Sequence, residues 1–491
     1  MIYKNTHISM NNSFILFFSI FSSLIVFFAV MHPMTLISGD DWIGISSYRD
    51  IYPKWHGFNP TKVLPEVLFP ASGVLSSIFS NIFRVNYLQS ISLITAILVS
   101  IAATAFLYQL YKLLTDKYST NQFNSSLIII IVLMTLLFMF KTLPFNKSTY
   151  LLWEINITCY YHYVIPVLLN SSVVLHLINH KQAKSNHCEN KGIYFGVLSI
   201  AIYFSIFSNV FASIILAVHC GTQLLFSLLN AKFNYKKTDK SNILYVCVIL
   251  LWIVSLVFEM NGGRASSIGK QNLEFLKSLD VLKGLLHQTD VFYAIMILIS
   301  IATGVYLSFH KLNTTQAMDM VKNIISALIV SIGLLLISAK ASPSYAERPV
   351  AMFGLFFFLI LTFSIAMAFI LTTVKTSVLI MPVIFTILIA KAFAYNTSLM
   401  NPHNLNLDYA TAEKISNAII GQVIEADLKG NATVTVRVPK GDDNDNWPWP
   451  IYMGESISKT LRLNGIIKNN IVVSVVPDTK LNEAFGIPAA K

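Results

Sequence analysis

The chain of 491 residues is 55% hydrophobic and only 12% charged, and its mean hydropathy of +0.62 exceeds what a soluble globular protein tolerates. This composition excludes a soluble fold and indicates a protein that crosses a membrane several times. The formal net charge is +11, from 35 Lys and Arg against 24 Asp and Glu. Most of this excess falls in short loops between apolar segments, so it gives no reason to invoke nucleic acid.

Eleven apolar segments are long enough to cross a hydrocarbon core of about 30 Å as helices. The first is interpreted as a retained anchor, because its apolar run is long for a signal peptide and no small-residue cleavage site follows it. The expected spans cover residues 14–31, 87–111, 126–144, 160–178, 193–207, 210–229, 243–258, 291–309, 324–337, 350–373 and 378–393.

The distribution of cations predicts the orientation of these spans, because Lys and Arg favour short cytoplasmic loops. With the N-terminus inside, the cytoplasmic loops hold thirteen lysines and four acidic residues, a balance of +9 out of +11. The basic stretches around Lys184 and Lys237 then share a side, so residues 193–229 must form a tight hairpin that turns near Ser208 and Asn209. An odd number of spans places the tail outside.

The segment from 395 to 491 is polar, with nine cations and ten acids, and it predicts a small soluble domain. Asp408 can cap a helix with apolar residues at helical spacing, and Gly430 suits its end. Valines at 434, 436 and 438 alternate with polar residues, as in a half-buried strand. A second helix over 455–463 and a second strand over 471–476 complete the pattern. We therefore expect an all-α membrane domain over 1–394 and a small α+β periplasmic domain over 395–491.

Other familiar motifs are missing from the sequence. The four cysteines show neither a disulfide framework nor metal-ligand spacing, and no Gly-rich phosphate loop occurs. The acidic run at 442–446 lacks the Gly and the distal Glu of a calcium loop, so it is interpreted as a solvated turn. An ATP-driven pump with its motor on the same chain is thereby disfavoured.

Two adjacent carboxylates, Asp40 and Asp41, lie just beyond the first span, and the cations Arg49, Lys54 and His56 follow in the same outer loop. A carboxylate at a membrane boundary can accept a proton from a hydroxyl group, and neighbouring cations can hold a phosphate. The alternative is that the pair caps a short helix that begins at Trp42.

The remaining outer loops carry further candidates for substrate binding. Acidic groups can orient sugar hydroxyls, and Arg can neutralise a phosphate leaving group. The alternatives are that Glu154 and His162 satisfy each other or the backbone at a helix end, and that the arginines are ordinary interfacial cations. The candidates in these loops are Glu154, His162, Arg264, Tyr345, Glu347 and Arg348.

This layout resembles the GT-C superfamily of integral-membrane glycosyltransferases, in which an acidic pair follows the first span and a soluble outer tail ends the chain. Its size is similar to that of bacterial and phage O-antigen glucosyltransferases that modify lipopolysaccharide. The resemblance implies that Asp40 or Asp41 is the catalytic base. It also implies a polyprenyl-phosphate sugar donor, with glucose as the sugar, and an O-antigen or other cell-surface glycan as acceptor. The implied location is the bacterial inner membrane.

Other classes of protein remain open on the sequence alone. An O-antigen polymerase or ligase uses the same lipid-linked substrates at the same face. A flippase or transporter of lipid-linked glycans also has many spans, but it places ionisable groups near the midplane, where these spans have few. A non-enzymatic assembly protein that acts through its tail is the third alternative. The sequence also leaves open whether the carboxylates hold a divalent cation or act without one.

Overall fold

The computed structural model describes most of the chain, and everything below refers to these residues. The described ranges are 6–36, 38–46, 60–140, 151–152, 154, 156–180, 191–231, 241–261, 273–311, 314–374, 381–394, 399–400, 407–440 and 453–487. Arg49, Lys54, His56 and Arg264 lie outside them, and so does the acidic run at 442–446.

The described part is mainly helical, in agreement with the composition. Within it, nine helices are long and apolar enough to cross a membrane, so the protein is a helical, multi-pass membrane protein. The elements up to α10 are α1 (Thr6–Val26), η1 (Phe27–Met31), α2 (Gly39–Ser46), α3 (Val63–Phe83), α4 (Tyr87–Lys112), η2 (Leu113–Lys117), α5 (Gln122–Phe138), α6 (Ile157–Cys159), η3 (Tyr160–Val164), α7 (Ile165–His180), α8 (Lys191–Ile206), α9 (Val210–Asn230) and α10 (Ser241–Asn261). After these come α12 (Phe275–Gln288), α13 (Val291–His310), α14 (Thr314–Ala341), η5 (Pro343–Glu347), α15 (Phe353–Thr373) and α16 (Met381–Ala394).

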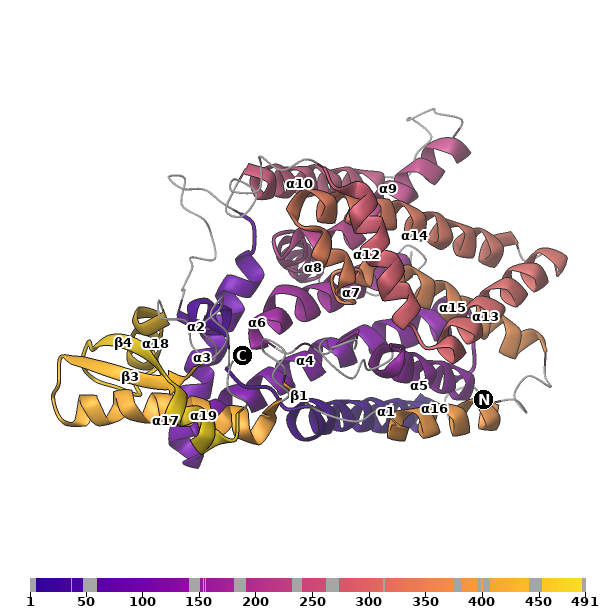
Figure 1. Cartoon of the computed structure of the whole chain (residues 1–491). Helices are drawn as coiled ribbons and strands as arrows, with labels where there is room; N and C mark the ends of the chain where they lie inside the picture. Colours follow the sequence, from indigo (N-terminus) through magenta and orange to yellow (C-terminus); the bar gives the residue numbers. More distant parts are fainter. Residues whose placement is uncertain are drawn as a thin grey trace.

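Eight of the eleven expected spans coincide with these nine helices, and the other three coincide with the shorter apolar helices α5, α8 and α16. The remaining long helix, α3, was not among the expected spans, because its residues were expected to be part of an outer loop. Pro65, Pro70 and Gly73 interrupt its apolar pattern, yet a proline in the first turn costs little and the helix continues through Pro70. In Figure 1, α3 runs crosswise to α1 and α4, near their ends.

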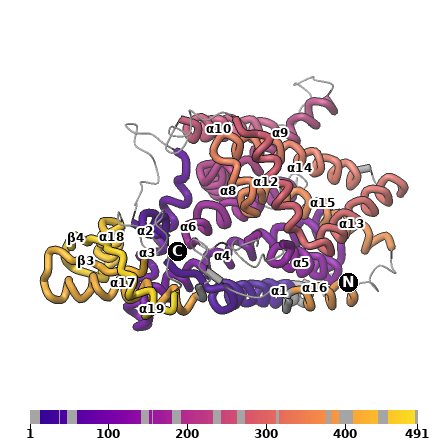
Figure 2. The backbone as a smooth tube through the Cα atoms, viewed as in Figure 1, coloured from indigo at the N-terminus to yellow at the C-terminus, as the bar shows by residue number. Residues whose placement is uncertain are grey.

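Figures 1 and 2 show α1, α4, α5 and α16 on one side of the bundle and α9, α10 and α14 on the other. The start of α1 lies at one end of the bundle, and α2, α3 and the C-terminal segment lie at the other, which we call the α2 end. The N-terminal end of α1 and the tail therefore lie at opposite ends of the bundle.

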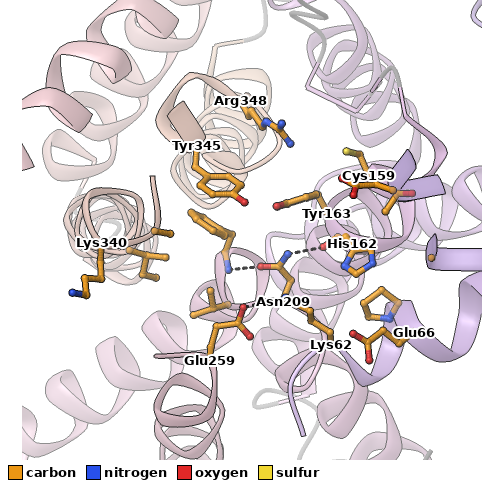
Figure 3. Close-up of a pocket in the computed structure, with 18 of the residues that line it drawn as sticks. Lys62, Glu66, Cys159, His162, Tyr163, Asn209, Glu259, Lys340, Tyr345 and Arg348 are labelled. Atoms are coloured by element: carbon orange, nitrogen blue, oxygen red, sulfur yellow. Dashed lines mark hydrogen bonds and ion pairs between the residues drawn. The ribbon is translucent and has the colours of Figure 1, made fainter. Parts of the chain in front are cut away.

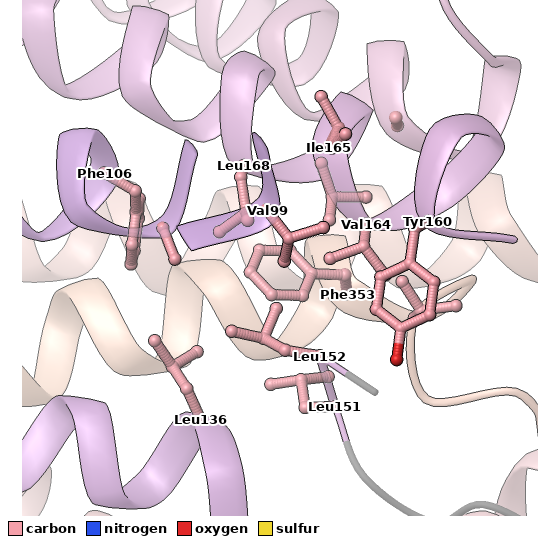
Figure 4. Packing of buried hydrophobic residues seen from close by; sticks show 14 of the residues in the cluster. Val99, Phe106, Leu136, Leu151, Leu152, Tyr160, Val164, Ile165, Leu168 and Phe353 are labelled. Carbon is pink, nitrogen blue, oxygen red and sulfur yellow. The ribbon is translucent and has the colours of Figure 1, made fainter. Parts of the chain in front are cut away.

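The centre of the bundle is built around α15, the most buried long helix. Phe353 at its start packs among Val99, Leu136 and Leu168, side chains of three other helices (Figure 4). Small residues let α13 approach α15 closely, since a Cβ atom on Gly304 would lie 2.5 Å from that of Ala366. This packing fixes the ends of the helices that carry the outer loops.

The tight hairpin expected at Ser208 and Asn209 is confirmed, because α8 ends at Ile206 and α9 begins at Val210. The Asn209 side chain caps α9 by accepting a hydrogen bond from the Phe211 amide at 2.9 Å. Its amide group donates to the His162 carbonyl at 2.9 Å. This turn therefore ties α9 to η3 at the α2 end.

The tail contains the two helices and two strands that the sequence predicts. The elements are β1 (Leu399–Met400), β2 (Leu407–Asp408), α17 (Tyr409–Leu428), β3 (Thr433–Pro439), α18 (Gly454–Leu463), β4 (Val472–Asp478) and α19 (Thr479–Phe485). Strands β3 and β4 pair in parallel, with Thr433 opposite Val472, and α18 connects them. Gly430 follows α17 in the left-handed region at φ 71°, as its predicted role at the helix end requires.

Candidate functional site

A cavity of about 660 Å³ opens at the α2 end, between α2, α3, η3, α10, α14 and η5 (Figure 3). This volume is in the range of pockets that hold small molecules. We call it the Asp40 pocket. The candidates Asp40, His162, Tyr345 and Arg348, which are separated widely in the sequence, all line it.

The two adjacent carboxylates have different roles in the structure. Asp40 is exposed and lines the pocket, whereas Asp41 is fully buried. The Asp41 carboxylate accepts a hydrogen bond from the Ser38 amide at 3.0 Å, and the Ser38 hydroxyl accepts one from the Asp41 amide at 3.2 Å. This reciprocal pair is a capping box at the start of α2. The capping alternative therefore describes Asp41, and Asp40 is the carboxylate placed to reach a bound molecule.

Asp41 also fixes α2 against the next wall of the pocket. Its second carboxylate oxygen accepts hydrogen bonds from the Thr158 amide at 2.8 Å and the Thr158 hydroxyl at 2.7 Å. Thr158 belongs to α6 and lines the pocket itself. Hydrogen bonds to a charged group contribute about 1.5–3 kcal/mol each, so this link holds α2 and α6 together firmly.

The tail packs against α2, which carries Asp40, and against the neighbouring helix α3. The Thr460 hydroxyl of α18 donates to the Trp42 carbonyl at 3.4 Å, and the Ser77 hydroxyl of α3 donates to the Asn464 carbonyl. Helices α2 and α3 are themselves in close contact, since a Cβ atom on Gly44 would lie 2.9 Å from the Phe69 ring. The tail therefore supports one wall of the pocket.

A polar rim crosses the mouth of the pocket. Glu66 and Lys62, at the start of α3, both line it, and the Lys62 ammonium lies 3.5 Å from the carboxylate of Glu259 on α10. Lys62 occupies the left-handed region at φ 58°, a conformation that residues other than glycine adopt rarely. Figure 3 shows His162 on the same side of the pocket as Glu66.

Aromatic rings and a guanidinium form the next wall. The hydroxyl groups of Tyr163 and Tyr345 point toward one another (Figure 3), and the ring of Phe211 lies 5.0 Å from that of Tyr345. The Arg348 guanidinium lies 5.6 Å from the centre of the Tyr345 ring, within the range of a cation–π interaction. His162 and Tyr163 lie on η3, a π-helical turn of the kind that is frequent at functional sites.

Glu154 lies beside Arg348, on a segment that two leucines anchor in the core. Leu151 and Leu152 are buried (Figure 4), and the Glu154 amide donates to the Tyr160 hydroxyl at 3.0 Å. Burial raises the pKa of the Glu154 carboxyl to about 7, while the positive charge of Arg348 acts in the opposite direction. Glu154 therefore changes charge near neutral pH next to the one arginine that lines the described pocket.

The remaining wall is apolar and comes from α10, α14 and the residue before α12. Its side chains are Leu256, Met260, Leu273, Leu336 and Ile337. Met260 is 55% exposed, Leu273 56% and Leu336 43%. This wall is therefore an exposed apolar surface, of the kind that a hydrocarbon chain can contact.

Other predicted residues are placed differently. Glu154 and Glu347 are not among the residues that line the pocket. The roles proposed for Arg49, Lys54, His56 and Arg264 stay predictions, because these residues lie outside the described part. The candidate set leaves out several polar residues that line the pocket, among them Lys62, Glu66, Asn209, Glu259 and Lys340. Four of these are charged residues next to apolar segments, and that position is the signal that identifies them.

Within the described residues, no group of three or more His, Cys, Asp or Glu side chains is arranged to hold a metal ion. Comparison with protein-family models, curated proteins and solved structures finds no match for this chain. The assignment of a function therefore depends on the chemistry of the pocket.

Proposed function

We propose that the protein is a membrane glycosyltransferase that moves a sugar from a polyprenyl-phosphate donor to a cell-surface glycan such as O-antigen. One observation carries this proposal. The Asp40 pocket combines an exposed carboxylate, an arginine and an exposed apolar wall. The carboxylate can accept a proton from the acceptor hydroxyl, the arginine can bind the donor phosphate, and the apolar wall can contact the hydrocarbon chain of the donor.

In this reaction the acceptor hydroxyl oxygen forms a bond to the anomeric carbon of the donor sugar. The bond from that carbon to the phosphate oxygen breaks, and polyprenyl phosphate leaves. Asp40 accepts the proton of the acceptor hydroxyl, and Arg348 stabilises the negative charge on the phosphate. His162, Glu66 and Tyr345 are placed to bind sugar hydroxyls, and the resemblance implies inversion at the anomeric carbon.

The proposed location is the bacterial inner membrane, with the N-terminus in the cytoplasm and the Asp40 pocket and the tail at the periplasmic face. The +9 balance of the loops assigned to the cytoplasm supports this orientation. A reporter active only in the periplasm should be active when fused after Lys491 and silent when fused near Lys237. The reverse pattern would place the pocket in the cytoplasm.

The proposed activity is tested by comparing the cell-surface glycan, by mass and linkage analysis, in cells with and without the chain. A glycosyltransferase adds one sugar at a defined linkage. A polymerase changes the number of repeat units instead, and a ligase or a flippase removes the whole glycan when it is lost. An identical glycan in both cells would reject all of these functions.

A further inference from the structure

A second cavity, of about 240 Å³, lies at the end of the bundle opposite the Asp40 pocket. Helix α14 connects the two cavities, because Asp319 lines the second and Lys340 lines the first. These residues are separated by about 31 Å at 1.5 Å per residue, close to the thickness of a hydrocarbon core of about 30 Å. The two cavities therefore lie near opposite ends of α14, about one hydrocarbon thickness apart.

Most of the residues that line the second cavity carry polar side-chain atoms, although the cavity lies among helices that are rich in apolar residues. Only two of its eleven lining residues, Ile178 and Ile365, lack a polar side-chain atom. A cavity lined by several polar and charged side chains is a candidate binding site. The polar lining residues are Lys117, Tyr118, His219, Gln223, Tyr245, Thr315, Asp319, Lys322 and Asn323.

The charges in this cavity leave a net positive balance. The Lys117 ammonium lies 2.8 Å from the Asp319 carboxylate, which also accepts a hydrogen bond from the Tyr118 hydroxyl at 3.1 Å. Asp319 therefore balances Lys117. Lys322 supplies a second cation, which lies 5.4 Å from the Phe226 ring and has no acidic partner among the described residues.

Two amide side chains line the same space. Asn323 is only 6% exposed, and neither Asn323 nor Gln223 makes a side-chain hydrogen bond within the described chain. A buried amide such as that of Asn323 is normally hydrogen-bonded, and Gln223 is half-buried, so both amide groups are available as donors to a bound molecule. A cation with two amide donors suits an anion with several oxygen atoms.

We propose that this cavity binds a phosphate monoester, with Lys322 as its cation and Gln223 and Asn323 as hydrogen-bond donors. The volume suits a phosphate group with a few further atoms, and it is far smaller than that of the Asp40 pocket. A metal cation does not fit, because the single carboxylate is already bound to Lys117 and Tyr118. The group can come from a lipid or from a soluble phosphate, and the proposal is independent of glycosyl transfer.

The test measures equilibrium binding of two radiolabelled probes to the full-length protein in nanodiscs of neutral lipid. The probes are inorganic phosphate and a short-chain isoprenyl monophosphate. Every protein compared carries Arg348→Gln, so that phosphate binding in the Asp40 pocket does not contribute to the signal. In this background we expect saturable binding, weakened about tenfold or more by Lys322→Gln, since a hydrogen bond to a charged group is lost.

Two further variants make the result specific. Gln223→Leu should weaken binding as well, because it removes an amide donor without changing charge, whereas Lys311→Gln, an exposed lysine at the same end, should leave it unchanged. Binding of the isoprenyl probe alone supports a lipid source, and binding of both probes or of inorganic phosphate alone supports a soluble one. No saturable binding, or equal binding by the parental, Lys322→Gln and Gln223→Leu proteins, would overturn the proposal.

Discussion

The two walls of the Asp40 pocket differ in how they are built. The polar wall consists of short elements, α2, α6 and the start of α3, which hold Asp40, Thr158 and Glu66. The capping box of Asp41, its link to Thr158 and the packing of the tail hold these elements in place. The opposite wall consists of the long helices α10 and α14, and exposed apolar side chains form its surface.

This difference separates chemistry from membrane contact. Reactive groups must be held within a fraction of an ångström, and hydrogen bonds to short elements do this without a helix that crosses the bilayer. A hydrocarbon chain needs only a continuous apolar surface, which spanning helices provide. Changes to the polar wall should therefore alter the rate of transfer, and changes to the apolar wall should alter the affinity for the lipid.

The largest effect is expected from Asp40→Asn, which removes the proposed base. General-base catalysis contributes typically 10²- to 10⁴-fold, so we expect a loss of about this size in the transfer rate, with donor affinity unchanged. The measurement is the rate of sugar transfer in membrane vesicles that contain equal amounts of protein.

Asp41→Asn provides the matched comparison. It replaces the oxygen that accepts the Ser38 amide, so we expect a lower melting temperature and a smaller loss of activity that follows the amount of folded protein. If both single Asn variants transfer sugar at the parental rate, Asp40 is not the base, and the pair serves only to form α2.

A smaller effect is expected from Arg348→Gln, which removes the cation proposed to hold the phosphate. A charge-assisted contact is worth about 1.5–3 kcal/mol, so donor binding should weaken by roughly 10- to 150-fold. Arg437→Gln is a suitable control, because this exposed arginine of the tail pairs with Asp478 and is not among the pocket residues. Unchanged donor affinity in Arg348→Gln would remove Arg348 from the site.

Glu154 should make donor binding depend on pH. Its raised pKa of about 7 means that it gains negative charge beside Arg348 as pH rises through neutrality. A phosphodiester donor keeps one negative charge over this range, so repulsion should weaken its binding between about pH 6 and 8, by at most about tenfold per pH unit. Glu154→Gln should lose this dependence. Donor affinity that rises with pH in the parental protein would contradict the assignment.

The parts of the fold that depend on local pattern were predictable from the sequence. The turn at Ser208 and Asn209 followed from the charges of neighbouring loops, and Gly430 followed from helix-end chemistry. Helix α3 was missed because Pro70 lies inside it, and a proline usually signals a break. Whether a proline interrupts a helix depends on the surrounding packing, which the sequence does not record.

The site was predictable only where a residue lies close to an end of an expected span. Asp40 and Arg348 were found in this way. The distinction between Asp40 and Asp41 was not predictable, because it depends on Thr158, which lies 117 residues further along the chain. The same limit applies to Lys62 and Glu259, whose ion pair joins α3 to α10 and requires knowledge of the tertiary fold.

The smallest effect is expected on the apolar wall. Leu336→Ala removes part of the surface proposed to receive the hydrocarbon chain, and each methylene that fails to be buried costs about 0.8 kcal/mol, or about fourfold in donor affinity. Leu328→Ala on the same helix, also exposed but outside the pocket, should bind the donor normally. Equal affinities in the two variants would show that the chain of the donor lies elsewhere.

The central claim, that the Asp40 pocket holds a lipid-linked sugar donor, is tested most directly by photocrosslinking. The probe is a polyprenyl-phosphate glucose with a photoreactive group on the isoprene unit next to the phosphate. We expect labelled peptides from α10 and α14, around Met260 and Leu336, and much weaker labelling in Arg348→Gln. Labelling that lies away from these helices, or that does not depend on Arg348, would contradict the account.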